Sequence, residues 1–293
     1  MIVSRLGDLP PAPARAIIIN CSTRVVTTLA LMSALKYANM PVLLIDCQST
    51  DGSWSWFEAL AQQHPFDLLR LPLKPHGKTL DRLFRESHDD ALLLIDSDLE
   101  ILQPDVIEAM RQAMRDLATY GAGFLHVGGA IHANLQPMVN EGRYMDRMWI
   151  PFCLLNVAKI RAVIAEGSTF MHSRDYLEFP WNKLVSRLLY ARQHLPLFKR
   201  LSLEVFADAR ERIHGERFLF REYDTGARLH AAMLKQGGVF ADLGDLLFSQ
   251  SVRHYHGVTR ATLVKDQENA TAPDSIAAEV ATRLVSEYAI RVG

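Results

Sequence analysis

The first half of the chain alternates short apolar runs with longer segments whose apolar residues recur at helical spacing. The runs predict buried strands at 16–19, 42–45, 67–71, 91–95 and 123–127. Helices are expected between them at 25–37, 53–63 and 79–87, and again after Pro104, which fits a first helical turn. Apolar runs of four or five residues that alternate with helices predict an α/β fold. Its sheet should be mostly parallel and covered by helices on both faces.

The second half is less regular. Residues 149–152 fit either a strand or a loop, and 239–240 and 246–255 are expected to be extended. Residues 181–217 have a mostly helical composition, and a helix at 224–236 should end at Gly237-Gly238. A polar linker near 265–274 precedes a final helix at 275–290, and the Pro-rich residues 1–15 are expected to be a leader arm.

Composition excludes several classes of protein. The 293 residues are 49% hydrophobic and 22% charged, which is unlike a disordered chain. With 32 Lys and Arg against 33 Asp and Glu, the net charge is −1, so there is no global basic field for nucleic acid. The uncharged stretch Thr119–Asn140 is too rich in Gly and polar residues for a membrane span, and the N-terminus does not resemble a signal peptide.

The three cysteines also indicate the cellular compartment. They lie far apart and form no CxxC pair, which argues against a cysteine-based zinc site. A sparse, odd number of cysteines is typical of a reducing compartment. We therefore expect a cytoplasmic protein, with attachment to the inner face of a membrane as an alternative.

Two acidic residues follow the strand expected at 91–95. Asp96 and Asp98 flank Ser97, and ligands of open α/β sheets bind beyond the carboxyl ends of the strands. Carboxylates at i and i+2 around a turn can face the same side, where Mg²⁺ or Mn²⁺ would accept their oxygens and keep positions for phosphates. An acidic turn with a capping aspartate explains the pattern equally well.

A polar turn that contains glycine, Asp46–Ser53, follows the second strand and opens a helix. Backbone N–H groups at such a helix start can meet an anion, and polar side chains can meet a base or a ribose. Taken alone, however, the segment is better explained as an ordinary strand-to-helix loop with Ser53 as the helix N-cap.

Four segments in order carry a family resemblance: Asn20–Arg24, Asp46–Gly52, Lys74–Asp81 and Asp96-Ser97-Asp98. From Ala16 to about Met110 the chain resembles the family 2 type of GT-A glycosyltransferases. These enzymes have a Thr-x-Asn-Arg-like first strand end, an Asp-Asp-Gly-Ser-Thr-Asp-Gly-like loop and an Asp-x-Asp motif. Cys47 stands where that loop has its second acidic residue, which leaves the base of the nucleotide open.

The resemblance implies one GT-A domain that transfers a sugar, with Mn²⁺ or Mg²⁺, from a nucleotide-diphosphate sugar to a hydroxyl group. The acceptor would be a glycan, a lipid-linked molecule or another hydroxyl compound. Residues 16–130 would bind the donor, 131–260 would bind the acceptor and carry a helical insertion at about 181–217, and 261–293 would form a helical tail. Ser22, Arg24, Asp46 and Asp51 would line the nucleoside pocket, and Asp96 and Asp98 would face ribose, metal and diphosphate.

The segment Arg221–Gly226 resembles the acidic stretch in which family members keep their catalytic base. An inverting transfer needs a carboxylate to take the proton from the acceptor hydroxyl. Asp224 is the first candidate and Glu222 the second. The local alternative for Asp224 is a helix N-cap, and the two roles are compatible.

Two histidines complete the candidate metal ligands. His254 and His256 are two residues apart on an expected strand and would share one face. Histidine is a common ligand of Mn²⁺-like ions, and several GT-A enzymes close the metal site with a late histidine. His256 is favoured because Gly257 allows close backbone approach, and a structural or exposed pair is the alternative.

Five positive residues and no acidic ones lie between Trp181 and Arg200. A solvated helix packed on the domain, or a partner interface, is favoured. The second interpretation is an amphipathic surface that meets anionic lipid or a lipid-linked acceptor. A homo-oligomer is compatible with the sequence.

Two other functions compete with sugar transfer. Aspartate-nucleophile phosphatases also place Asp-x-Asp after an apolar strand, but they have Thr or Val where this chain has Glu100, and three strands precede the motif here. A non-catalytic sugar-nucleotide binder or assembly partner would keep Asp96 and Asp98 and lack a working base.

Overall fold

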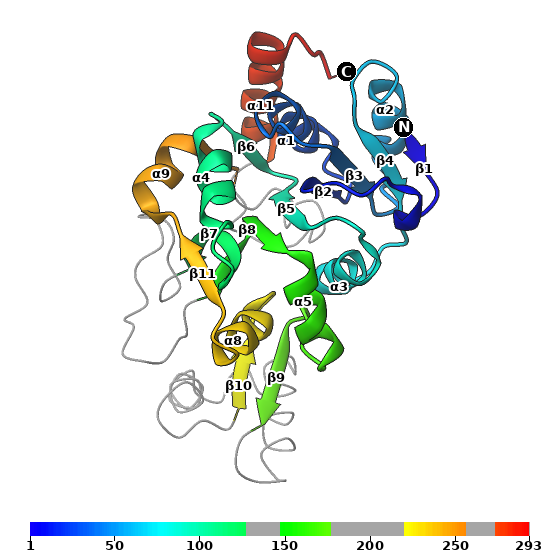
Figure 1. The fold of residues 1–293 in the computed structure, drawn as a ribbon. Helices are drawn as coiled ribbons and strands as arrows, with labels where there is room; N and C mark the ends of the chain where they lie inside the picture. Colours follow the sequence, from blue (N-terminus) through cyan, green and yellow to red (C-terminus); the bar gives the residue numbers. More distant parts are fainter. Residues whose placement is uncertain (127–146, 177–219, 256–272, 293) are drawn as a thin grey trace, which may run out of the picture.

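The computed structural model of the protein describes residues 1–126, 147–176, 220–255 and 273–292 (Figure 1). Its strands are β1 (Ile2–Val3), β2 (Arg15–Asn20), β3 (Val42–Asp46), β4 (Asp67–Arg70), β5 (Ala91–Asp96), β6 (Leu99–Ile101), β7 (Thr119–His126), β8 (Arg147–Asn156), β9 (Ser173–Tyr176), β10 (Phe220–Tyr223), β11 (Val239–Asp242) and β12 (Val252–His254). Eight of these strands form one sheet in the order β1-β4-β3-β2-β5-β8-β7-β11. Neighbouring strands in this sheet are parallel, except that β8 runs antiparallel to β5 and β7. The predicted α/β class with a mostly parallel sheet is therefore confirmed.

Helices cover both faces of this sheet. They are η1 (Leu6–Asp8, a 3₁₀ turn), α1 (Arg24–Tyr37), α2 (Ser53–Leu60), α3 (His76–Glu86), α4 (Asp105–Ala113), α5 (Val157–Ala165), α8 (Ala227–Lys235), α9 (Gly244–Ser251) and α11 (Pro273–Tyr288). Apolar residues of α1, α2, α4, α9 and α11 join one buried cluster, and those of α3, α5 and α8 join another. The predicted helices on both faces of the sheet are confirmed.

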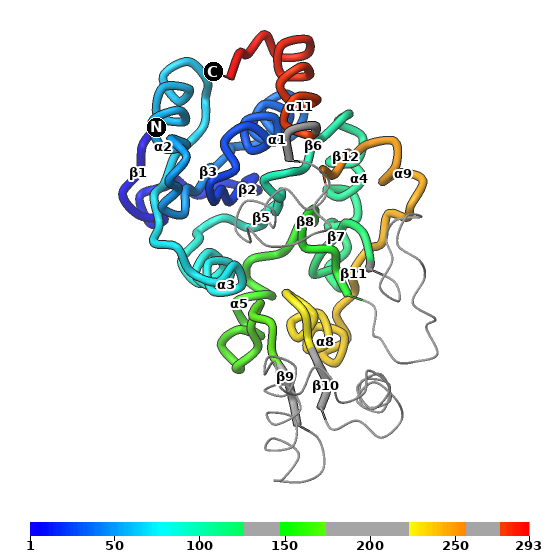
Figure 2. The backbone as a smooth tube through the Cα atoms, turned by 180° about the vertical axis from the view of Figure 1, so that it is seen from behind, coloured from blue at the N-terminus to red at the C-terminus, as the bar shows by residue number. Residues whose placement is uncertain are grey.

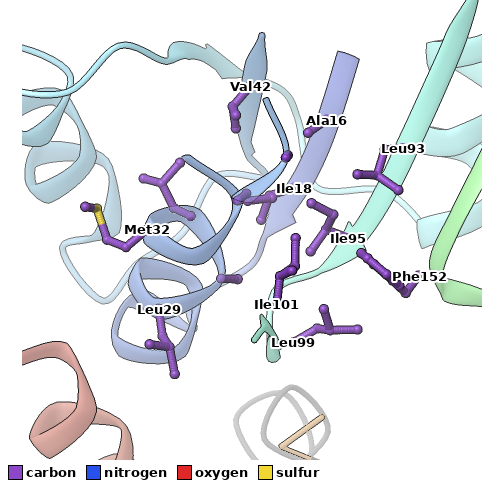
Figure 3. Close-up of a cluster of buried hydrophobic side chains, with 14 of the residues drawn as sticks. Ala16, Ile18, Leu29, Met32, Val42, Leu93, Ile95, Leu99, Ile101 and Phe152 are labelled. Carbon is purple, nitrogen blue, oxygen red and sulfur yellow. The ribbon is translucent and has the colours of Figure 1, made fainter. Parts of the chain in front are cut away.

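The central strands divide their side chains between these two clusters. Ile18 and Ile95 lie in the cluster with α1 (Figure 3), whereas Ile17 and Leu94 lie in the cluster with α3. A strand that is buried on both faces needs apolar residues at every position, which explains why β2 and β5 are continuous apolar runs.

The first fifteen residues belong to the folded unit. β1 extends the sheet by pairing in parallel with β4, and Leu6 and Leu9 are buried in the cluster with α3. Residues 1–15, which the sequence predicts as a leader arm, thus contribute β1 to the sheet and two buried leucines to the cluster with α3.

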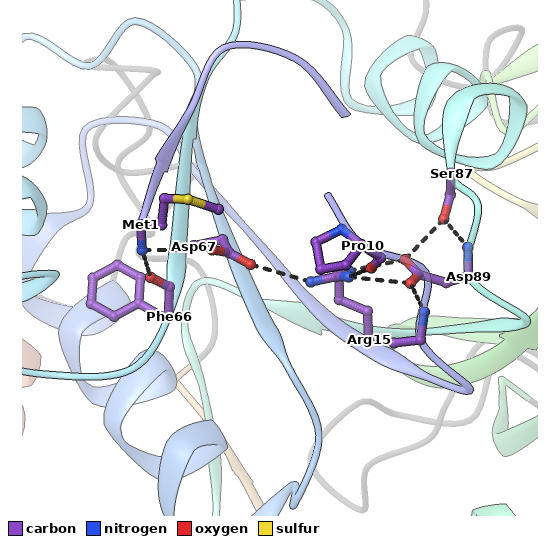
Figure 4. A network of polar contacts seen from close by, with 8 residues as sticks. Met1, Pro10, Arg15, Phe66, Asp67, Ser87 and Asp89 are labelled. Atoms are coloured by element: carbon purple, nitrogen blue, oxygen red, sulfur yellow. Dashed lines mark hydrogen bonds and ion pairs between the residues drawn. The ribbon is translucent and has the colours of Figure 1, made fainter. Parts of the chain in front are cut away.

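A buried ion-pair network lies at the amino ends of the parallel strands (Figure 4). Arg15 is 1% exposed, and its Nε donates to Oδ2 of Asp89 at 2.9 Å. The same guanidinium contacts Oδ2 of Asp67 at 3.3 Å and the carbonyl oxygen of Pro10 at 2.6 Å. It thereby joins the first residue of β2 to the first residue of β4 and to the loop before β5.

Most differences from the sequence prediction fall in the second half. Residues 246–255, predicted to be extended, form α9 and then the short strand β12, because helical spacing buries Phe248 against the core. The predicted helix at 224–236 begins only at Ala227, after a turn at Asp224–Gly226. Residues 149–152 are part of the ten-residue strand β8, and α5, which was not predicted, follows it.

The predicted helical insertion at about 181–217 lies outside the described residues, as do the expected linker and the basic stretch 181–200. The predicted final helix is α11, which lies beside α1 in both views (Figure 1, Figure 2). Val280 and Leu284 anchor it in the core and are fully buried. Among the helices that the structure describes, none has the length and apolar character to cross a membrane.

Candidate functional site

The order of the strands places a switch point between β2 and β5, where open α/β sheets bind ligands in a crevice. From β2 the chain adds β3 and then β4 on one side, whereas β5 pairs on the other side of β2. At such a switch point, the loops that leave the two strands diverge and leave room for a ligand beyond their carboxyl ends. The segments Asn20–Arg24 and Asp96–Asp98 leave the strands at this place, and the hydroxyl groups of Thr23 and Ser97 lie 3.3 Å apart.

Hydrogen bonds join the loops after β2 and β3 into one unit. The side-chain amide of Asn20 donates to Oδ1 of Asp46 and to the hydroxyl oxygen of Ser49, both at 2.9 Å. Ser22 donates its backbone N–H to the Ser49 oxygen, and its own hydroxyl oxygen accepts the N–H of Thr50. Asp46 is 0% exposed, and its carboxylate accepts hydrogen bonds from the side chain of Asn20 and from the backbone N–H of Ser49.

Asp51 fixes the start of two helices. Its carboxylate accepts the N–H of Arg24 at 3.0 Å and the N–H of Ser53 at 3.1 Å. Burial raises the pKa of Asp51, but the hydrogen bonds from Ser53 and Arg24 outweigh it and hold that pKa below its ordinary value. The expected N-cap, Ser53, is instead the first residue of α2, after Gly52 in the left-handed region at φ 81°.

Asp96, Asp98 and His254 come together at the carboxyl end of β5. One ligand atom from each of the three lies within 4.8 Å of the others, and His254 Nε2 is 3.1 Å from Asp98 Oδ1. Asp98 is 5% exposed, and Asp96 is half-buried. Burial raises the pKa of Asp96, and the charge of Asp98 raises it further, whereas His76 and His254 lower it. Two carboxylates held this close in a shielded place favour a cation between them.

His254 reaches this place through a small antiparallel sheet. β12 pairs with β6 so that His254 lies opposite Leu99, next to Asp98 in the chain. The ring of Trp149 meets the His254 ring edge-on, with centroids 5.2 Å apart. Trp149 is 6% exposed and packs on Phe248 as well, so it orients the histidine from within the core.

A small pocket lies beside Asp96. Most of its lining is apolar and comes from β2, α3, β5 and β8, and His76 and Asp96 supply its polar side: Ile17, Ile19, His76, Leu80, Leu94, Ile95, Asp96 and Ile150. His76 is the first residue of α3 and belongs to the segment Lys74–Asp81, one of the four that carry the family resemblance. Asp81, at the end of that segment, is buried and accepts the N–H of Phe170.

Asp224 lies in the turn between β10 and α8. Its carboxylate is 2.8 Å from Nη2 of Arg147, and 59% of its side chain is exposed. Burial lowers the pKa of Arg147, while Asp224 opposes that effect. Arg147 is the first residue of β8, which runs antiparallel to β5. The ion pair of Arg147 and Asp224 therefore lies beyond the carboxyl end of β5, at the same edge of the sheet as Asp96. Glu222 lies in β10, opposite Arg174 of β9.

The described cluster differs from the expected ligands in its histidine. His256 lies outside the described residues, and His254, the second choice from the sequence, supplies the ring beside Asp98. No signal in the local sequence indicated that His76 faces the same pocket.

No family model and no curated protein matches the chain. Among solved structures, S. aureus TarS 1–349 is similar over 52% of this chain and 49% of its own length, with 13% identity and a TM-score of 0.38. The same fragment in complex with UDP gives 15% identity and 0.39. The mannosyltransferase PcManGT from Pyrobaculum calidifontis, in complex with GDP-Man and Mn²⁺, is similar over 96% of this chain and 90% of its own length, with 11% identity and 0.43. Similarity of this degree assigns no family, and the chain spans about half of the TarS fragment that it matches.

Proposed function

We propose that the protein is a metal-dependent glycosyltransferase that moves a sugar from a nucleotide-diphosphate sugar to an acceptor hydroxyl, with inversion. The observation that supports this most directly is the convergence of Asp96, Asp98 and His254 at the switch point between β2 and β5. Beside them lie the loops Asn20–Arg24 and Asp46–Gly52, which are already shaped by internal hydrogen bonds.

The donor set fits a divalent cation. Two carboxylates and one imidazole suit Mn²⁺ or Mg²⁺, with Mn²⁺ favoured by the histidine. When bound, such an ion would offset the negative charge that gathers on the departing nucleotide diphosphate. The chain's own residues would hold the donor, with Ser22, Arg24 and Asp51 around the nucleoside.

Asp224 would take the proton from the acceptor hydroxyl, and Glu222 is the second candidate for this role. An inverting transfer needs a carboxylate in this role, and the ion pair with Arg147 at 2.8 Å holds that of Asp224 in place. Exposure of Asp224 leaves it open to an acceptor. A cytoplasmic location stays a prediction, and membrane contact stays the second interpretation of residues 181–200.

The proposal is tested by metal and nucleotide binding to matched aspartate variants. Mn²⁺ binding is measured by calorimetry, and UDP, GDP and their sugars are screened by thermal shift with and without Mn²⁺. Asp98→Asn removes one charge from the cluster with little change in shape. Asp90→Asn is the control, because Asp90 is exposed at the opposite end of the same strand.

We expect the wild-type protein to bind Mn²⁺ and to gain thermal stability from one nucleotide-diphosphate sugar only when Mn²⁺ is present, by mass action. Asp98→Asn should lose both effects, and Asp90→Asn should keep both. Sugar transfer or donor hydrolysis that continues in Asp98→Asn at the original rate, with the same metal dependence, would show that the site is placed wrongly.

A further inference from the structure

Glu100 carries a fully buried carboxylate two residues after Asp98. Arg283 of α11 donates from Nε to both of its oxygens, at 3.0 and 2.9 Å, and from Nη2 to Oε1 at 2.5 Å. The hydroxyl of Tyr255 donates to Oε2 at 3.1 Å.

These contacts join the segments on which two of the candidate metal ligands stand. Glu100 lies in β6, directly opposite Arg253 of β12. The N–H of Tyr255 donates to the carbonyl oxygen of Asp98 at 2.8 Å. The positions of Asp98 and His254 therefore depend on how β6 and β12 are held together, and Glu100 lies in the middle of that pairing.

The third partner comes from the C-terminal helix. Val280 and Leu284 of α11 are buried in the same cluster as Leu29 of α1, and Arg283 points from the helix to Glu100. A buried carboxylate is stable only when a cation and hydrogen-bond donors surround it. Docking of α11 therefore supplies the guanidinium of Arg283 to Glu100 in β6, the strand that follows Asp98.

We propose that Arg283, Glu100 and Tyr255 are positioning residues through which the docked α11 fixes the spacing of Asp98 and His254, and thereby sets the affinity of the site for a divalent cation. The inference rests on the proposed function, because it needs the site to bind a cation. It goes further by making the C-terminal helix a determinant of metal affinity, although none of the three side chains belongs to the described metal cluster.

A second ion pair between the same elements provides a matched control. Arg253 of β12 lies 3.5 Å from Glu279 of α11, with 44% and 54% of the two side chains exposed. An exposed pair of this kind contributes little to holding two elements together. Glu279→Gln therefore removes a charge from α11 without disturbing the buried network.

The experiment measures the dissociation constant of Mn²⁺ and the electron paramagnetic resonance spectrum of the bound ion, at a temperature at which circular dichroism shows every variant folded. We expect Arg283→Ala to weaken Mn²⁺ binding by about 10- to 100-fold, as is typical when groups that orient metal ligands are lost. Tyr255→Phe should weaken it less, because one hydrogen bond is lost. Arg283→Lys should recover part of the loss, and Glu279→Gln should match the wild type.

Two failures can be told apart. Wild-type protein that does not bind Mn²⁺ overturns the proposed function and this inference together. Wild-type protein that binds Mn²⁺ while Arg283→Ala and Tyr255→Phe bind it equally well, with unchanged spectra, overturns this inference alone. If Arg283→Ala does not fold, Tyr255→Phe decides the matter, because it removes a single hydroxyl and leaves the backbone contact with Asp98 in place.

Discussion

The amide of Asn20 donates to the buried carboxylate of Asp46 at 2.9 Å, and the two residues are direct neighbours in register at the ends of β2 and β3. Thr23 and Thr27 donate their hydroxyl groups to the oxygen of the same amide. The loops that flank the switch point are thus shaped by buried polar contacts within the protein before any ligand arrives.

This contact predicts the effect of removing Asp46. In Asp46→Ala, the buried N–H donors of Asn20 and Ser49 lose an acceptor, which should lower the free energy of unfolding by about 1–3 kcal/mol. Urea denaturation measures the change. The exposed Asp90, changed to alanine in parallel, should shift the free energy by no more than about 0.5 kcal/mol. Equal values for the two variants would contradict the structural role of Asp46.

The buried network at the amino ends of the strands predicts a larger loss of stability. Arg15→Ala leaves Asp89, which is 8% exposed, without its main cation, and should cost about 3–5 kcal/mol in the free energy of unfolding. Arg5→Ala removes an arginine from a solvent-exposed pair with Asp8 and should leave stability unchanged within error. Thermal and urea unfolding of both variants tests the contrast, and a mild effect in Arg15→Ala would speak against a buried pair.

Close backbone packing at Gly77 predicts sensitivity to a single methyl group. A Cβ at this position would lie 2.7 Å from backbone atoms of Phe170 and Met171, so Gly77→Ala must push apart α3 and the segment that follows α5. We expect a loss of about 1–3 kcal/mol in unfolding free energy. Gly7→Ala is the control, because no atom lies within 4 Å of its added Cβ. Unchanged stability in Gly77→Ala would show that this packing is looser than described.

The three cysteines should differ in reactivity. Cys21 is half-buried, whereas Cys47 and Cys153 are buried. Burial raises the pKa of Cys47 to about 12 and also raises the pKa of Cys153, so both thiols stay protonated at pH 8. Iodoacetamide at pH 8 followed by peptide mass spectrometry should label Cys21 first, and labelling of all three should require urea. Labelling of Cys47 in the native protein as fast as Cys21 would refute this ranking.

The strands around the switch point could be predicted from the sequence because they are buried on both faces. Ile17 and Ile18 point to opposite faces and are both fully apolar, so the run itself identifies β2. The loops after these strands were predicted for the same reason, since each polar segment begins where an apolar run ends. Asn20, Asp46 and Asp96 are each the last residue of a strand, and these strands are parallel. The three residues therefore lie at the same edge of the sheet.

Other features depend on contacts between distant segments. His254 meets Asp98 across 156 positions of the chain through the pairing of two three-residue strands, and such short strands carry almost no pattern of their own. α9 was predicted as extended because Leu246, Leu247 and Phe248 resemble an apolar strand, whereas only Phe248 is buried. Nothing in the sequence indicated that Glu100 forms a buried ion pair, because its partner Arg283 lies 183 positions away. From sequence, Glu100 counted only as an argument against an aspartate-nucleophile phosphatase.

The Arg15 network and the candidate site lie at opposite ends of the same strands. Substitutions at well-separated places usually add in their effects on stability. Substitutions at exposed loop positions of the candidate site should therefore leave the stabilising contribution of the Arg15 network unchanged. The network on which folding depends most and the exposed loop positions of the candidate site thus lie at different ends of β2 and β5.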